Sequence, residues 1–208
     1  MARWEAGAEG RLAQAAYELY LERGFDDVTV AEIAAHAGLT KRTYFRYFAD
    51  KREVLFSGAT AFQASVVANL MAASDDVPPI DVVVVALCAG GTEITKMGER
   101  ARQRQRLIDS SPDLQEREMI KMESLTRAIA EGLVLRGIPE PRSSLTAQAG
   151  VAVFRTAFAR WADGEDSVDF ADLVRDTLDK LRSAIHSAEV EVQTVPVNPL
   201  LGRDLRHE

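Results

Sequence analysis

Residues 38–51 read GLTKRTYFRYFADK, and this stretch carries more charged and aromatic side chains than a short helix needs. So much positive charge would be out of place on a buried helix, and four aromatic rings would be out of place on a helix that faces only water. The stretch therefore has two partners, a hydrophobic interior and something that attracts cations. The basic residues are Lys41, Arg42, Arg46 and Lys51, and the aromatic residues are Tyr44, Phe45, Tyr47 and Phe48.

The residues around this stretch predict short helices joined by tight turns. Thr29 and Glu32 have the spacing of a capping box, which starts a short helix. Gly38 ends that helix, and Thr40 caps the next one. The small side chain of Ala34 and the missing Cβ of Gly38 allow the two helices to cross closely. This pattern predicts a helix-turn-helix.

Helical spacing assigns the two faces of the second helix. We expect Tyr44 and Phe48 to point inward with Ile33 and Leu39. Lys and Arg can contact guanine O6 and N7 in a DNA major groove, while apolar groups contact thymine methyls. Lys51, at the start of the following helix, is expected to contact a phosphate. The outer face carries Lys41, Arg42, Thr43, Phe45 and Arg46.

The charge distribution supports a local anion-binding surface. The chain of 208 residues has a formal net charge of −7, which argues against general binding to polyanions. Between residues 40 and 52, however, five basic residues face one acidic residue, Asp50. A concentrated basic patch on an acidic protein is typical of a surface that binds an anionic partner.

The segment TVAEIAAHAGLTKRTYFRYFADKREVL resembles the DNA-binding segment of the TetR family of bacterial transcriptional regulators. The resemblance implies a homodimeric repressor that binds a palindromic operator, with an effector-binding domain in the later helices. The family usually has tyrosine at the position of Phe45, which cannot offer a hydroxyl to a phosphate; Tyr47 is the alternative donor. By position, the DNA-contacting set is Thr29, Thr40, Lys41, Arg42, Thr43, Phe45, Arg46, Tyr47 and Lys51.

Apolar residues recur at helical spacing almost throughout, so we predict an all-α fold of about nine helices. The predicted units are a DNA-binding domain (1–54), an effector-binding and dimerisation domain (55–188) and a disordered tail (189–208). The capping pair Asp50 and Glu53 predicts one long helix to residue 73. The pair Gly90-Gly91 is expected to interrupt the next helix.

The last two long predicted helices, over 142–162 and 168–186, carry wide apolar stripes that predict a two-fold dimer. The alternative is that these stripes face the monomer's own core. The stripe residues are Val153, Phe154, Ala157, Phe158 and Trp161 on the first, with Leu173, Val174, Leu178, Leu181 and Ile185 on the second.

Aromatic and methionine side chains at helical spacing suggest a cavity for a small lipophilic effector, although such residues are more often plain core. One of the alternating arginines between Arg100 and Arg106 could face an anionic group of the effector, or the DNA-binding module; surface ion pairing is the simpler reading. The long helix from Asp50 would connect cavity and DNA. The expected lining residues are Phe62, Val66, Leu70, Met97, Met119, Met122, Phe154, Phe158 and Trp161.

Other classes of function have little support in the sequence. No nucleophile elbow, phosphate loop or metal-binding spacing is visible, so we expect no enzyme, cofactor or metal. The first residues lack the apolar stretch of a signal peptide, and the apolar run 82–89 is too short to cross a bilayer, so we expect a cytoplasmic protein. The remaining alternative is a helical small-molecule carrier or interaction domain without specific DNA binding.

Overall fold

The computed structural model describes residues 2–164 and 168–192, and these residues form an all-α fold, as predicted. A 3-10 helix, η1 (Glu53–Phe56), separates the first three helices from the rest. The α-helices are α1 (Ala2–Arg23), α2 (Val30–His36), α3 (Lys41–Tyr47), α4 (Ala59–Ala72), α5 (Pro79–Thr95), α6 (Glu99–Asp109), α7 (Pro112–Leu135), α8 (Arg142–Ala162) and α9 (Phe170–Val192).

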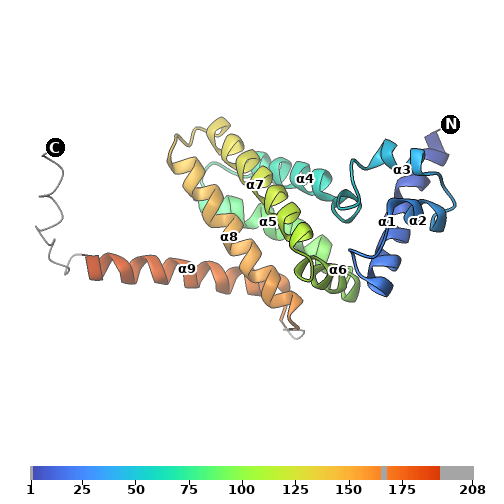
Figure 1. The fold of residues 1–208 in the computed structure, drawn as a ribbon. Coiled ribbons are helices and arrows are strands. Elements are labelled where there is room, and N and C mark those ends of the chain that lie inside the picture. Colours follow the sequence, from blue (N-terminus) through green and yellow to red (C-terminus); the bar gives the residue numbers. More distant parts are fainter. Residues whose placement is uncertain (1, 165–167, 193–208) are drawn as a thin grey trace, which may run out of the picture.

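The first three helices form a module at one end of the molecule (Figure 1). Its core consists of buried side chains from α1, α2, α3 and η1, and the fully buried Tyr20 and Tyr44 lie among them. Leu107, Ile108 and Leu114 belong to the same core, although they lie on α6 and α7. The module is therefore packed onto the corner between α6 and α7.

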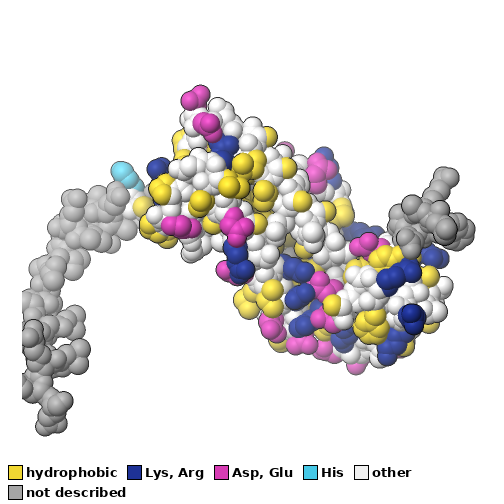
Figure 2. All heavy atoms as spheres, turned by 90° about the horizontal axis from the view of Figure 1, so that it is seen from above, with side chains coloured by type: hydrophobic (Ala, Val, Ile, Leu, Met, Phe, Trp, Pro, Cys, Tyr) yellow, Lys and Arg dark blue, Asp and Glu magenta, His cyan; other side chains and the backbone are white. Residues whose placement is uncertain are grey.

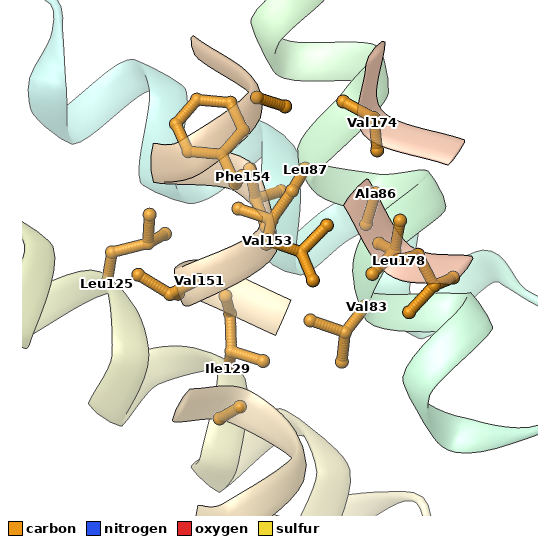
Figure 3. Close-up of a cluster of buried hydrophobic side chains, with 14 of the residues drawn as sticks. Val83, Ala86, Leu87, Leu125, Ile129, Val151, Val153, Phe154, Val174 and Leu178 are labelled. Atoms are coloured by element: carbon orange, nitrogen blue, oxygen red, sulfur yellow. The ribbon is translucent and has the colours of Figure 1, made fainter. Parts of the chain in front are cut away.

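A second core lies between α4, α5, α7, α8 and α9. Figure 3 shows Val83 and Leu87 of α5, Ile129 of α7, Val153 of α8 and Leu178 of α9 pointing toward one another. Together these side chains bury a continuous apolar surface, which is the main stabilising contribution to a domain of this size.

The prediction of one long helix over 50–73 was wrong, because the chain forms two helices there, η1 and α4, with a turn at residues 57–58 between them. Asp50 does contact the chain just before η1, whose N-cap residue is Arg52: its Oδ1 accepts from the backbone N–H groups of Arg52 (2.8 Å) and Glu53 (3.1 Å). The Glu53 carboxylate does not complete the capping box, because it pairs with Arg117 and Lys121 of α7. No single rigid helix joins the DNA-binding module to α4.

The expected interruption at Gly90-Gly91 was also wrong, since α5 continues through both residues. A Cβ on Gly90 would lie 2.6 Å from the Phe62 ring, and one on Gly91 would lie 2.3 Å from the Phe170 ring. Both contacts are closer than packed carbon atoms allow. The two glycines therefore make room for aromatic rings.

The apolar stripes of α8 and α9 mostly face the monomer's own core, so the dimer surface predicted from them was wrong in its residues. Val153, Phe154, Trp161, Leu173 and Leu178 are among those buried. Among the stripe residues only Ile185 is well exposed. It lies on α9, one end of which projects beyond the other helices (Figure 1). α9 continues to Val192, so it includes the first four residues of the predicted disordered tail (189–208); residues 193–208 lie outside the described part.

One segment among the described residues, Glu53–Ala72, is apolar and long enough to cross a membrane by length and composition alone. It consists of η1, the turn after it and α4. Val54, Leu55 and Phe56 contribute to the N-terminal core, and Val66 and Leu70 contribute to the second core. A helix of a packed domain passes the same test, so this observation is weak evidence for a membrane span.

We predict that Gly91→Ala lowers the free energy of unfolding by about 1–3 kcal/mol, because the new methyl group overpacks the core against Phe170 and Phe154. The matched control is Gly10→Ala in α1, where a Cβ meets nothing within 4 Å. This control should stabilise the protein by up to about 1 kcal/mol. Urea unfolding followed by circular dichroism measures both; equal stability of Gly91→Ala and the wild type would contradict the packing argument.

Candidate nucleic-acid interface

The two faces of α3 have different environments, as the sequence predicts. Tyr44 is fully buried and its hydroxyl donates to the Asp50 carbonyl at 3.1 Å; its ring packs 5.3 Å from that of Phe48, which ends the helix. Burial raises the pKa of Tyr44 far above its ordinary value, so the hydroxyl stays protonated and donates. Lys41, Arg42 and Arg46 are exposed.

Backbone caps fix the start of both helices of the motif. Thr40 Oγ1 accepts from the Thr43 N–H at 3.1 Å. Thr29 and Glu32 form the expected capping box, with Glu32 Oε2 accepting from the Thr29 N–H (2.8 Å) and hydroxyl (2.7 Å). The Thr29 hydroxyl, the Thr29 N–H and Arg23 lower the pKa of Glu32 to about 2. These caps matter because isolated helices of two turns are not stable in water.

The turn between α2 and α3 needs a glycine. Gly38 has φ = +67°, a conformation that other residues adopt only with strain. The following N–H, of Leu39, donates back to the Ala34 carbonyl at 2.8 Å and closes the turn. This closure sets the angle between α2 and α3 and so determines which α3 side chains reach outward.

Phe45 and Tyr47 extend the outer surface of α3. Phe45 is 49% exposed, so its ring adds apolar surface to the outer face of α3. The Lys41 ammonium lies 6.0 Å from the Phe45 ring centroid, and Arg46 donates to the Tyr47 hydroxyl at 2.9 Å. The outer surface is therefore apolar at its centre with cations around it, and Figure 2 shows Lys and Arg side chains standing out on this lobe.

Lys51 is engaged differently from what the sequence suggests. Its ammonium donates to three backbone carbonyls in the turn after α1, those of Phe25 (2.9 Å), Asp26 (3.3 Å) and Val28 (3.5 Å). It also lies 4.1 Å from the centroid of the Phe25 ring. These contacts use all three N–H groups of the ammonium. A phosphate contact, the expected role, would require the side chain to leave them.

The residues expected to line an effector cavity do not all come together. Met97 and Met119 are 50% and 57% exposed, so these two lie on the surface. Val66, Leu70, Phe154 and Trp161 are buried, and Phe62, Met122 and Phe158 are partly buried against the same core. The rings of Phe62, Phe154, Phe158, Trp161 and Phe170 pack against one another with centroids 5.4–6.1 Å apart. These rings fill the centre of the domain.

Two hollows open at the surface of this domain. One, of ≈230 Å³, lies beside Arg136, whose guanidinium donates to the Leu70, Ala73 and Ser74 carbonyls and so caps α4. The other, of ≈160 Å³, lies between α4 and α7 and includes Phe62 and Met122 of the expected set. Its other lining residues are Ala59, Thr60, Gln63, Lys121, Ser124 and Leu125.

The alternating arginines of α6 contact aromatic rings on both sides of the helix. Arg100 lies 4.7 Å from the centroid of the Tyr17 ring, and Arg104 lies 5.1 Å from that of Phe56, both in the N-terminal module. Arg102 lies 4.6 Å from Trp161 of α8. The reading in which arginines contact the DNA-binding module is confirmed for Arg100 and Arg104. Arg106 instead pairs with Glu99.

Sequence reasoning missed the link between Glu53 and α7. Glu53 pairs with Arg117 and, at 3.0 Å, with Lys121, and all three side chains are mostly buried. More than sixty residues separate Glu53 from its partners, so no local spacing pointed to them. Within the described part of the chain, no group of three His, Cys, Asp or Glu side chains could hold a metal ion.

The profile of the bacterial regulatory proteins of the tetR family matches residues 12–57, which include the whole helix-turn-helix. The profile of the MftR C-terminal domain matches residues 77–186, more than half of the chain. The chain belongs to the TetR family. Its fold and its relatives are those of transcriptional regulators with a DNA-binding helix-turn-helix.

Individual relatives agree with this assignment. The chain is 28% identical over 159 residues to a Mycobacterium tuberculosis protein named for transcriptional regulation of mycofactocin biosynthesis, MftR, and the match covers 74% of this chain and 79% of the relative. Two solved structures share the fold. SmeT of Stenotrophomonas maltophilia in complex with triclosan matches with a TM-score of 0.61 at 16% identity, over 85% of this chain and 90% of its own. NalD, the secondary repressor of the MexAB-OprM efflux pump in Pseudomonas aeruginosa, matches with a TM-score of 0.59 at 16% identity, over 86% and 96%.

We predict that Lys51→Met lowers the free energy of unfolding by about 1–3 kcal/mol, because three carbonyl groups lose a charged donor. The matched control is Lys41→Met, an exposed lysine of α3, which should stay within about 0.5 kcal/mol of the wild type. Chemical unfolding measures both changes. If Lys51→Met left stability unchanged but reduced the salt dependence of DNA binding, the side chain would be a phosphate contact instead.

Proposed function

We propose that this protein is a homodimeric repressor in the cytoplasm that binds a palindromic DNA operator and is released by a small lipophilic effector. The observation that carries the DNA-binding part is the outer face of α3. Its buried side is anchored by Tyr44 and Phe48, so Lys41, Arg42, Phe45 and Arg46 face outward on a helix that cannot rotate. This is the arrangement with which a recognition helix enters a major groove.

The chemistry of this face suits base recognition in addition to phosphate binding. Arg42 can donate two hydrogen bonds to guanine O6 and N7, and the exposed Phe45 ring suits a thymine methyl group. Thr40, Thr43 and Tyr47 lie on or next to α3 with hydroxyl groups that can contact phosphates, whereas the Thr29 hydroxyl would first have to release the Glu32 carboxylate. We assign these residues, with Lys41 and Arg46, to the DNA contact surface.

A palindromic operator presents two equivalent half-sites, so two copies of the recognition helix, and therefore a dimer, are needed to bind it. Two such helices about 34–36 Å apart fit successive major grooves on one side of the duplex. Exposed apolar residues on the second domain, Val85, Leu145 and Ile185, offer a surface for the second copy. Val85 lies one turn after Asp81, and Ile185 lies one turn after Arg182; Asp81 and Arg182 pair at 2.6 Å, so α5 and α9 are adjacent here.

The effector part of the proposal is supported by the apolar character of the second domain. The Phe62 ring and the apolar side chains of Ala59, Met122 and Leu125 make up half of the lining of the hollow between α4 and α7, which supports a ligand with a lipophilic part. The related fold of SmeT was determined with triclosan bound, a property of that protein that makes a lipophilic effector a reasonable proposal for this one. A carrier without DNA binding would leave the exposed cations of α3 unexplained.

We predict that Arg42→Ala reduces affinity for the cognate operator by about 1–3 kcal/mol and relaxes preference at particular base pairs. The operator is first selected from genomic fragments by binding to the wild-type protein. Affinities for this duplex and for a random duplex are then measured across a range of salt concentrations, because the phosphate contribution depends on salt.

The control for this experiment is Lys180→Ala. Lys180 pairs with Asp176 at 2.7 Å on the exposed surface of α9, outside the DNA-binding module, so its removal should change both affinities little. An equal loss of affinity for cognate and random duplex in Arg42→Ala would contradict base recognition. Salt-independent or undetectable binding of the wild type to any duplex would favour the carrier.

A further inference from the structure

The hollow between α4 and α7 is next to the ion pair that connects η1 to α7. Lys121 lines the hollow and at the same time pairs with Glu53 at 3.0 Å. Half of the lining residues are apolar (Ala59, Phe62, Met122 and Leu125), and Lys121 is the charged residue of the lining. A partly apolar site with one cation fits a ligand with a hydrophobic body and one carboxylate.

The size of the hollow limits the ligand. At ≈160 Å³ it is close to the volume of a cavity that accepts one benzene molecule, about 150 Å³. A single aromatic ring or a short branched chain would therefore fill it. On the exposed side, Ser124 donates to Gln63 Oε1 at 3.2 Å across the opening between α7 and α4.

Glu53 connects this site to the DNA-binding module. It lies on η1, where the next three side chains, those of Val54, Leu55 and Phe56, are buried in the core of the module. Its carboxylate contacts Arg117 and Lys121 of α7. Burial alone would raise the pKa of Glu53, but these two hydrogen bonds hold it below its ordinary value. The carboxylate is therefore ionised at neutral pH and attracts Lys121.

We propose that the effector is a small hydrophobic carboxylate that binds in this hollow and competes with Glu53 for Lys121. The ligand's carboxylate takes the place of one Glu53 oxygen, and η1 keeps only its contact with Arg117. The module then loses part of its attachment to α7, and the spacing of the two recognition helices in the dimer is less well fixed. This inference rests on the proposed function and names the ligand class and the coupling residues.

The test uses phenylacetate as the probe and phenylacetamide, which has the same shape without the charge, as its control. Binding to the full-length protein is measured by calorimetry without DNA. Lys121→Gln should weaken phenylacetate binding by about tenfold or more, since a charge-assisted hydrogen bond is lost. Glu53→Gln should strengthen it, because the competitor is gone. Neither substitution should change phenylacetamide binding by more than about twofold.

If Glu53 competes with the ligand, the two substitutions change the affinity for phenylacetate in opposite directions. This result distinguishes competition from an ion pair that only stabilises the fold. If Glu53 and Lys121 only hold the fold together, both substitutions destabilise the site and both weaken phenylacetate binding. That result, or no binding of phenylacetate to the wild type, would overturn the proposal. As a second variant, Ser124→Phe should fill the hollow from the exposed side and abolish binding of both probes; unchanged binding would place the ligand elsewhere.

A separate measurement tests the coupling. Phenylacetate should lower the affinity of the wild type for its operator, while Glu53→Gln should bind the operator more weakly from the start and respond less to the probe. Competition in calorimetry without any effect on operator affinity would overturn the coupling. Absence of operator binding by the wild type would reject the repressor itself, and the calorimetric results on the site would still stand.

Discussion

The orientation of α3 depends on the burial of Tyr44. A helix of seven residues cannot hold its own conformation in water, so its position has to come from the side chains it buries and from its caps. The Tyr44 ring is enclosed in the N-terminal core, and its hydroxyl is held by the Asp50 carbonyl. Because the Tyr44 side of α3 is buried, the side chains of Arg42 and Arg46 face solvent. The contact surface for DNA is thus a consequence of the core beneath it.

Attachment of this module to the second domain uses side chains instead of a continuous helix. α6 is shared between the two cores: Ala101 is buried in the second core, while Leu107 and Ile108 are buried in the first. Arg104 strengthens this attachment by donating to the Leu55 carbonyl at 2.9 Å and packing on Phe56, and burial lowers its pKa. Contacts of this kind can loosen individually, which a rigid helix cannot do. A regulator needs such contacts, because a ligand shifts only an equilibrium between states of similar energy.

Much of the N-terminal module could be predicted from the sequence because its signals are local. Thr29 with Glu32, Gly38 and Thr40 act through the backbone within a few residues, and each did what its spacing indicates. The arginines of α6 were less predictable, because surface ion pairing was the simpler reading and Arg100, Arg102 and Arg104 instead contact aromatic rings. The existence of the helices of the second domain was also predictable, because helical periodicity is a property of each segment alone.

The errors concern properties that depend on distant partners. Gly90 and Gly91 were expected to break a helix, but the rings of Phe62 and Phe170 occupy the space that a Cβ at these two positions would need. Met97 and Met119 have the right spacing for a lining and yet face water, since spacing does not say which face another helix will cover. Lys51 contacts three carbonyls of the α1–α2 turn, which no local pattern indicated, and its expected phosphate contact stays a prediction. In each case the deciding atom lies outside the local segment.

The central claim is that Arg42 contacts guanine bases from the outer face of α3. A double-mutant cycle tests it most directly: each guanine of the selected operator is replaced by 7-deazaguanine, which lacks the N7 acceptor, and wild type and Arg42→Ala are titrated with every duplex. Our account predicts that at one guanine per half-site the replacement weakens wild-type binding and leaves Arg42→Ala nearly unaffected. Additive losses at every guanine would contradict it.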